Sequence, residues 1–484
     1  MSSQKTCFLL IMVFCSSAQA SSIEWRDCKI GGEKGQPELS AQCARFEVPE
    51  NPAEPSGLKL SLNLARVPAR AKSPLPDPVF FLAGGPGQAA IESFPQMVGG
   101  FREILSKRDV ILVDQRGTGG SARLECKQER SLLEGLTEAP DLEQLKAETL
   151  KCLGQLKADP RFYSTSDYIR DLQSVRAALG LGPINLYGGS YGTRVALSYL
   201  KAHPDALRAL IIDGVAPQDL ALGSEHARNL ESALLALDQR CRKDSECTRR
   251  FGDLKVQRDE LKVALDANPQ IVEIISPTRF EPLEVRISGD TLIAGVRLLT
   301  YAPETIALLP ILIHESARDG GRTLARQALM TIGSLEESLS PLMELSVICT
   351  EDVPFFPADS ASERNTLMGT TLIDYARARC SVWPRGDLPK NFKDPVVSDK
   401  PVLLLSGEFD PVTPPRYAEH AAKGLSNSRH LVAPGQGHIA LFRGCMGKLA
   451  AQFLNDLKPA ELKAECLKSL TPAPLFSSFN GSEP

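Results

Sequence analysis

The sequence predicts an α/β fold: a mostly parallel central sheet flanked by helices, with one large helical insertion. Short continuous apolar runs, each closely followed by Gly, Asp or Ser, are typical of strands buried on both faces. They occupy residues 79–82, 110–113, 184–187, 209–212 and 402–405. Helical patterns lie between these runs, most clearly over residues 167–179 behind a possible cap at Ser166. Strands that alternate with helices indicate a parallel sheet.

The strand pattern stops between about residues 220 and 400, where charged, leucine-rich helical segments dominate. A chain of 484 residues is long for one core, so a large domain with an insertion fits its length. We therefore predict a first core segment over residues 21–220, a helical cap over 221–400 and a second core segment over 401–484. Residues 476–482 are expected to form a loose tail.

The composition excludes several classes of protein. Hydrophobic residues make up 43% and charged residues 24%, as in ordinary soluble globular proteins. The formal net charge is -4 and no run of Lys or Arg occurs, which argues against nucleic acid as a partner. Neither a metal nor an organic cofactor is implied, because no C-x-x-C motif occurs and no histidine has metal spacing to a cysteine.

The first 20 residues are predicted to be a signal peptide. Lys5 precedes an apolar run over residues 7–15, and Ala18-Gln19-Ala20 forms a small-x-small cleavage pattern. The run is too short to span a bilayer, so we expect an exported protein, periplasmic or secreted, with no stable membrane insertion after cleavage. Ten cysteines remain, an even number that suits disulfides between sequence neighbours, paired in order.

The turn Gly188-Gly189-Ser190-Tyr191-Gly192 predicts a nucleophilic serine. A predicted strand runs into it and a predicted helix over residues 193–202 leaves it, which is the setting of the nucleophile elbow in the α/β-hydrolase fold. The glycines are expected to let strand and helix approach closely while Ser190 points outward.

A nucleophilic serine needs a base and an acid. Of the six histidines, His438 lies late in the chain, in a glycine-containing loop after an apolar stretch, where the order Ser, acid, His places the base. Asp410, after the predicted strand 402–405, is the favoured acid, with Glu408 and Asp213 as alternatives. The remaining five histidines receive no catalytic role: His203, His226, His314, His420 and His430.

Two main-chain amides should stabilise the oxyanion. Tyr191, directly after the nucleophile, supplies one, and the glycine-rich loop over residues 83–88 supplies the other, with Gly85 as the favoured donor. Asp114 and Arg116 lie in another glycine-rich turn, and we expect them to hold the oxyanion loop rather than to act chemically.

Four separated motifs together resemble the prolyl and tripeptidyl aminopeptidases, most closely the secreted tripeptidyl-aminopeptidase-like branch. The resemblance runs from about Cys43 to Cys466 and implies an α/β-hydrolase core with a helical cap. Ala83 and Tyr191 depart from the His and Trp of prolyl aminopeptidases, which weakens the expectation of proline specificity. The motifs are Gly84-Gly85-Pro86-Gly87, Asp114-Gln115-Arg116-Gly117-Thr118-Gly119, Gly188-Gly189-Ser190-Tyr191-Gly192 and Gly407-Glu408-Phe409-Asp410-Pro411-Val412-Thr413-Pro414.

The resemblance implies a serine exopeptidase that releases residues from free peptide amino termini through an acyl-enzyme. By the same resemblance Ser190, Asp410 and His438 form the triad. Glu351 and Asp352, in a cysteine-acid motif of the cap, would bind the substrate ammonium group, although a solvated acidic turn is an equal alternative. A carboxylic ester or lactone hydrolase on the same triad, and a binding protein with an inactive site, are the competing functions.

Overall fold

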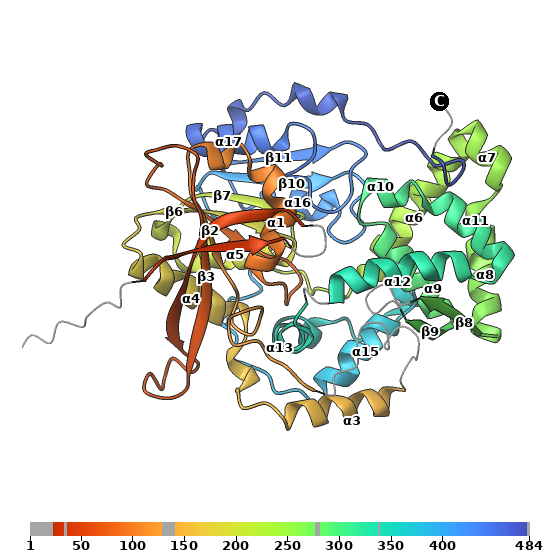
Figure 1. Cartoon of the computed structure of the whole chain (residues 1–484), viewed down its shortest axis with the longest axis horizontal. Helices are drawn as coiled ribbons and strands as arrows, with labels where there is room; N and C mark the ends of the chain where they lie inside the picture. The colour runs from red at the N-terminus through yellow and green to blue at the C-terminus, as the bar shows by residue number, and fades with distance from the viewer. Residues whose placement is uncertain (1–22, 33–35, 128–140, 276–280, 337–338, 482–484) are drawn as a thin grey trace, which may run out of the picture.

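A computed structural model describes residues 23–32, 36–127, 141–275, 281–336 and 339–481, so the predicted signal peptide lies outside the described residues. A nine-stranded sheet forms its centre, in the order β1-β2-β3-β5-β4-β6-β7-β10-β11 (Figure 1). Every pair from β5 to β11 is parallel, and the three pairs from β1 to β5 are antiparallel. The predicted mostly parallel sheet is confirmed.

The five apolar runs of the sequence are the central strands of this sheet, and nearly all their residues are buried because helices cover both faces. They are β4 (Val79–Leu82), β5 (Val110–Val113), β6 (Ile184–Gly189), β7 (Leu207–Asp213) and β10 (Val402–Gly407). The outer strands are β1 (Arg26–Gly31), β2 (Glu38–Pro49), β3 (Lys59–Val67) and β11 (Ser428–Ala433). The sequence did not predict β1 and β2, whose exposed side chains interrupt the apolar pattern.

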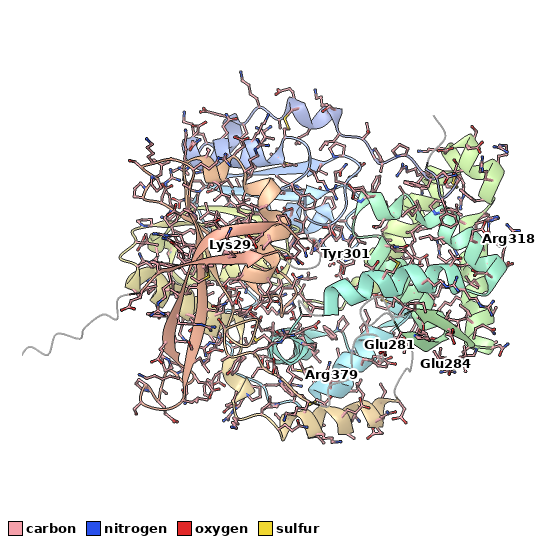
Figure 2. All side chains as sticks on the ribbon, in the orientation of Figure 1. Lys29, Glu281, Glu284, Tyr301, Arg318 and Arg379 are labelled. Atoms are coloured by element: carbon pink, nitrogen blue, oxygen red, sulfur yellow. A yellow bond between two sulfur atoms is a disulfide. The ribbon has the colours of Figure 1, made fainter. Side chains whose placement is uncertain are left out.

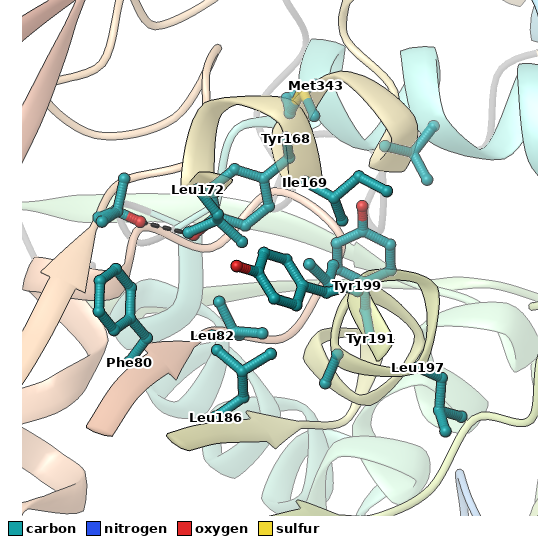
Figure 3. Packing of buried hydrophobic residues seen from close by; sticks show 14 of the residues in the cluster. Phe80, Leu82, Tyr168, Ile169, Leu172, Leu186, Tyr191, Leu197, Tyr199 and Met343 are labelled. Carbon is teal, nitrogen blue, oxygen red and sulfur yellow. Dashed lines mark hydrogen bonds between the residues drawn. The ribbon is translucent and has the colours of Figure 1, made fainter. Parts of the chain in front are cut away.

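Helices around the sheet position the loops at the carboxyl ends of its strands. They are α1 (Ala90–Phe101), α3 (Leu142–Leu153), α4 (Thr165–Ala178), α5 (Tyr191–Ala202), α16 (Pro415–Ala422) and α17 (Met446–Asp456). The cap of α4 is Ser164 and not Ser166, because Ser164 and Asp167 form a reciprocal capping box. Figure 3 shows side chains of α4 and α5, including Leu172 and Tyr191, packed over Leu82 and Leu186 of the sheet.

The segment between β7 and β10 is mainly helical and packs in two parts (Figure 1). Helices α6 to α12 have a hydrophobic core of their own, whereas α13 and α15 contribute Met343 and Cys380 to the core beside the sheet. The sequence did not predict the hairpin β8 (Gln270–Ile275) and β9 (Pro282–Ile287). The helices are α6 (His226–Lys243), α7 (Ser245–Phe251), α8 (Leu254–Ala267), α9 (Gly289–Leu299), α10 (Pro303–Ile306), α11 (Leu309–Asp319), α12 (Arg322–Glu336), α13 (Pro341–Glu351), α14 (Ala361–Arg364) and α15 (Thr371–Cys380).

The ten cysteines outside the predicted signal peptide form five disulfides between neighbours, which confirms the predicted pairing. They are Cys28–Cys43, Cys126–Cys152, Cys241–Cys247, Cys349–Cys380 and Cys445–Cys466. The prediction of a loose tail is wrong at its start. Leu475 is buried in the core of α6 to α12, and the amide of Phe476 donates to the carbonyl of Ala307, because the cap offers the tail an apolar surface.

Candidate active site

Ser190 occupies a strained turn between β6 and α5. Its backbone angles are φ 54° and ψ -123°, a region that a residue with a side chain rarely adopts. A Cβ at Gly188 would lie 2.3 Å from the carbonyl oxygen of Gly192, and one at Gly192 would lie 2.3 Å from that of Leu82. The expectation that every glycine of the turn is needed for close approach is wrong for Gly189, where a Cβ would meet nothing nearer than 3.5 Å.

His438 is hydrogen-bonded to Asp410, its predicted partner. His438 Nδ1 lies 2.8 Å from Asp410 Oδ2, and both side chains are almost fully buried. Asp410 Oδ1 also accepts from the amides of Val412 and Thr413, at 2.8 Å each. Burial lowers the pKa of His438, but the negative charge and hydrogen bond of Asp410 outweigh it and raise that pKa above 6.5. This arrangement can hold the imidazole ring and stabilise its protonated form.

The two alternative acids bind main-chain amides instead. The carboxylate of Asp213 accepts from the amides of Ala440 and Leu441 at 2.8 Å each, and burial raises its pKa to about 6. Its carbonyl oxygen accepts from the amide of Ser190 at 2.8 Å. Glu408 accepts from the amide of Gly435 at 2.7 Å. Among the described residues, Asp410 is the one carboxylate that is hydrogen-bonded to His438.

The predicted oxyanion loop lies against Ser190. A Cβ at Gly84 would lie 3.1 Å from the Cβ of Ser190, and Gly85 has φ 102°, which favours glycine. Asp114 accepts hydrogen bonds from the amide of Ile91, in the helix after this loop, and from the amide of Gly120. The loop therefore has the support that the sequence predicted, while the donor roles of Tyr191 and Gly85 stay predictions.

Arg116 and Tyr191 point into the core. Arg116 forms two hydrogen bonds of 2.7 Å to the carboxylate of Asp171. Its other acceptors are the carbonyls of residues 49, 50 and 162, so the prediction that it holds the oxyanion loop is wrong, although its role is structural. The hydroxyl of Tyr191 lies 2.7 Å from Thr165 Oγ1 and 3.2 Å from Gln115 Nε2. These hydrogen bonds anchor the side chain of Tyr191 in the interior. Tyr191 is the first residue of α5, and its amide is one predicted oxyanion donor.

Glu351 and Asp352 have internal partners in the structure. Both side chains are fully buried. Glu351 accepts from the amide and the hydroxyl of Thr165, at 2.6 and 2.7 Å, and burial raises its pKa to about 7. Asp352 accepts from Arg194 Nη1 at 2.7 Å and from the amide of Leu222 at 2.8 Å. Substrate binding by this pair stays a prediction, and the observed partners do not favour it.

Four polar side chains without a predicted role lie near His438 or near one another. The ring of Tyr301 meets that of His438 edge-on, with centroids 5.5 Å apart, and the guanidinium of Arg297 lies 5.6 Å from the Tyr301 ring centroid. His226 is within electrostatic reach: burial, with Arg297 and His438, lowers its pKa to about 3. Glu344 follows in the first turn of α13, and burial raises its pKa against the opposing charges of Arg379 and Arg297.

These four side chains share one property. Within the described ranges, none of them has a side-chain hydrogen bond or an ion pair. Partly buried polar groups without protein partners that converge beside a nucleophile are typical of a ligand-binding site. No sequence signal marked these residues, since helical spacing says nothing about which cap residues reach the sheet. The structure places Tyr301, Arg297 and His226 near His438, and Glu344 within electrostatic reach of Arg297.

Within the described ranges no helix is both long and apolar enough to cross a bilayer. The same ranges contain no group of three or more His, Cys, Asp or Glu side chains arranged to hold a metal ion.

The sheet order, the strained serine turn and the position of His438 after the last strands define an α/β-hydrolase. Known families agree: the model described as "alpha/beta hydrolase fold" matches residues 77–240, and that described as "TAP-like protein" matches residues 366–466. The chain has the α/β-hydrolase fold, it is a serine hydrolase, and it is similar to aminopeptidases of that fold. The resemblance noted in the sequence is thereby confirmed.

The chain is also similar to individual proteins and to solved structures. The chain is 24% identical to serine protease Hip1 of Mycobacterium tuberculosis over 89% of this chain and 88% of the relative. It is 26% identical to a tripeptidyl aminopeptidase of Streptomyces lividans, over 42% of this chain and 40% of the relative. The crystal structure of a proline iminopeptidase from Mycobacterium smegmatis matches 86% of this chain and 98% of its own, with 18% identity and a TM-score of 0.44.

Proposed function

We propose that this protein is an exported serine exopeptidase that cleaves peptides from their free amino terminus, releasing aminoacyl or tripeptidyl groups. The hydrogen-bonded pair His438 and Asp410 is the observation that supports it. Asp213 links the loop that follows His438 to the Ser190 turn. The peptidases among the relatives point to peptide substrates. Five disulfides and the predicted signal peptide support export to an oxidising compartment.

The proposed mechanism uses the triad in two steps. Ser190 Oγ attacks the scissile carbonyl carbon and loses its proton to His438 Nε2, while the amides of Tyr191 and Gly85 stabilise the oxyanion. His438 then donates that proton to the leaving amine, and the C–N bond breaks to give an acyl-enzyme. His438 then removes a proton from a water molecule, which attacks the acyl carbon. The ester C–O bond to Ser190 breaks, and His438 returns the proton to Ser190 Oγ, which releases the acyl group as a carboxylic acid. Asp410 keeps Nδ1 protonated and stabilises the imidazolium in both steps.

A free amino terminus requires a negatively charged partner near Ser190. Glu344 is the carboxylate best placed for this role, because it has no partner among the described residues. Its helix α13 contacts the oxyanion loop: the amide of Ser340 donates to the carbonyl of Gly87 at 2.9 Å, and the amide of Glu344 donates to that of Ser340. Before either could bind the substrate, Glu351 would have to lose its hydrogen bond from Thr165, and Asp352 its bond from Arg194.

The decisive experiment compares free and N-acetylated copies of aminoacyl and tripeptidyl chromogenic amides, with simple esters alongside. We expect purified mature enzyme to cleave only the free amides, and Ser190→Ala to lose both turnover and labelling by a fluorophosphonate probe. Glu344→Gln should raise KM for the free amides far more than Glu351→Gln does. Equal turnover of blocked and free amides would refute the exopeptidase, and turnover of esters alone would establish the carboxylic ester or lactone hydrolase instead.

A further inference from the structure

Arg297, in the last turn of α9, has an unpaired guanidinium close to the proposed active site. In the part of the chain that the structure describes, its side chain makes no hydrogen bond and no ion pair. It is partly buried, and its one ring contact is with Tyr301, 5.6 Å from the ring centroid. Glu344 is the acidic side chain within its electrostatic reach, but it forms no hydrogen bond or ion pair with Arg297 among the described residues. A guanidinium that is partly removed from water without hydrogen-bonded acceptors is unfavourable, so its presence here indicates a ligand that supplies them.

The position of this cation relative to His438 is set by Tyr301. The ring of Tyr301 stands at 83° to the His438 ring, with the centroids 5.5 Å apart. The carbonyl of Tyr301 also accepts a 2.8 Å hydrogen bond from the amide of His438. Arg297, Tyr301 and His438 therefore form one continuous row from the cap to the proposed general base. Figure 2 shows Tyr301 at the inner side of the cap, whereas Arg318 lies at its outer edge.

Arg297, Tyr301 and His438 lie beside the place where the leaving group of the substrate must bind. In acyl transfer by a serine, the imidazole donates its proton to the leaving amine, so the leaving group must lie against His438. The acyl carbonyl lies instead at the oxyanion loop, which α13 contacts through Ser340 and Gly87. Glu344 thus belongs to the acyl side and Arg297 to the leaving side, and the two unpaired charges have opposite sign.

We propose that Arg297 binds a carboxylate on the leaving part of the substrate, so that the enzyme prefers peptides with a negative charge directly after the cleaved bond. This inference rests on the proposed exopeptidase function. The carboxylate has two possible sources: the C-terminal carboxylate of a short peptide, or an acidic side chain in the first leaving residue. A guanidinium recognises both by the same paired hydrogen bonds.

The experiment measures kcat/KM on matched substrates. One pair differs in the terminus, with a single leaving alanine as the free acid or as the amide. The second pair differs in the side chain, with a leaving aspartate amide or asparagine amide. We expect the wild-type enzyme to favour at least one carboxylate by about 10-fold, the size of one charge-assisted hydrogen bond. The pair of substrates that shows the preference identifies the source of the carboxylate.

Variants assign the preference to Arg297. Arg297→Gln should abolish it by lowering kcat/KM on the charged substrates about 10-fold more than on their neutral partners. Arg297→Lys should keep part of the preference because the charge remains. The matched control is Arg318→Gln, another cap arginine, which is 69% exposed and pairs with Glu315 at the surface. We expect this control to retain the full preference.

Two outcomes would overturn the inference: a wild-type enzyme without preference in either pair, or Arg297→Gln lowering kcat/KM equally on charged and neutral substrates. Turnover of the neutral free-amine amide separates these results from failure of the exopeptidase function, because it does not involve Arg297. If no peptide is cleaved, esters with charged and neutral leaving alcohols test Arg297 directly. Absence of discrimination between those esters would again reject the role of Arg297.

Discussion

The main-chain carbonyl of Asp213 accepts a 2.8 Å hydrogen bond from the amide of Ser190. The carboxylate of the same residue accepts the amides of Ala440 and Leu441, two and three positions after His438. One buried residue at the end of β7 thus holds the serine turn with its backbone and the histidine loop with its side chain. This arrangement explains why an aspartate that is not bonded to His438 lies so close to it.

Replacing Asp213 should therefore disturb the site without removing a member of the proposed triad. Asp213→Asn keeps one acceptor and turns an N–H group towards the other amide, which leaves a buried donor unsatisfied at a cost of about 1–3 kcal/mol. We expect a lower Tm and a lower kcat, measured by thermal unfolding and by chromogenic amide turnover. Glu408→Gln is the control, since Glu408 is exposed, and it should change neither value.

Asp410 should set the pH dependence of activity. Because its charge raises the pKa of His438, and the base acts only when neutral, activity falls as the pH drops below that raised pKa. Asp410→Asn removes the charge, so the acid limb of the kcat/KM profile should move to lower pH while kcat falls by about 10⁴-fold. A profile with an unmoved acid limb would show that His438 is not the titrating base.

Two glycines of the serine turn should respond differently to the same change. Gly192→Ala places a Cβ 2.3 Å from the carbonyl of Leu82, and overpacking of this kind costs about 1–3 kcal/mol or more. Gly189→Ala has 3.5 Å of clearance and should keep both stability and most of its activity. The measurements are Tm and fluorophosphonate labelling of Ser190. Equal losses in both variants would contradict the close approach of β4 and α5.

The disulfides of the cap should stabilise it unequally. Cys349–Cys380 and Cys241–Cys247 are both buried, but they close loops of 31 and 6 residues. Loop-closure entropy makes the longer crosslink about 1.5 kcal/mol more stabilising. Replacing each pair by two alanines should therefore lower Tm more for Cys349–Cys380. Denaturant unfolding of both variants checks the difference, and the reverse order would show that native packing outweighs loop entropy.

The apolar runs of the sequence predicted the strands well where both faces of the strand are buried. The runs at β4 and β5 coincide with the predicted ranges, because a strand covered on both faces consists of apolar residues throughout. Strands β1 and β2 escaped prediction because half of their side chains are exposed. The sequence placed the start of α4 too late, because it favoured Ser166 as the cap. The reciprocal hydrogen bonds between Ser164 and Asp167 show that Ser164 is the cap.

The sequence by itself determined the parallel strands of the sheet, the strand-to-helix turn at Ser190 and the order of the candidate acid and base. These properties depend on local periodicity and on glycine spacing. The tertiary structure decided which of the many possible disulfide pairings occurs and that Glu351 is bonded to Thr165 inside the protein. It also decided that Arg297 and Glu344 have no hydrogen-bond or ion-pair partner among the described residues. The physical reason is that the partners of a charged side chain come from segments far apart in the chain, and no local pattern records them.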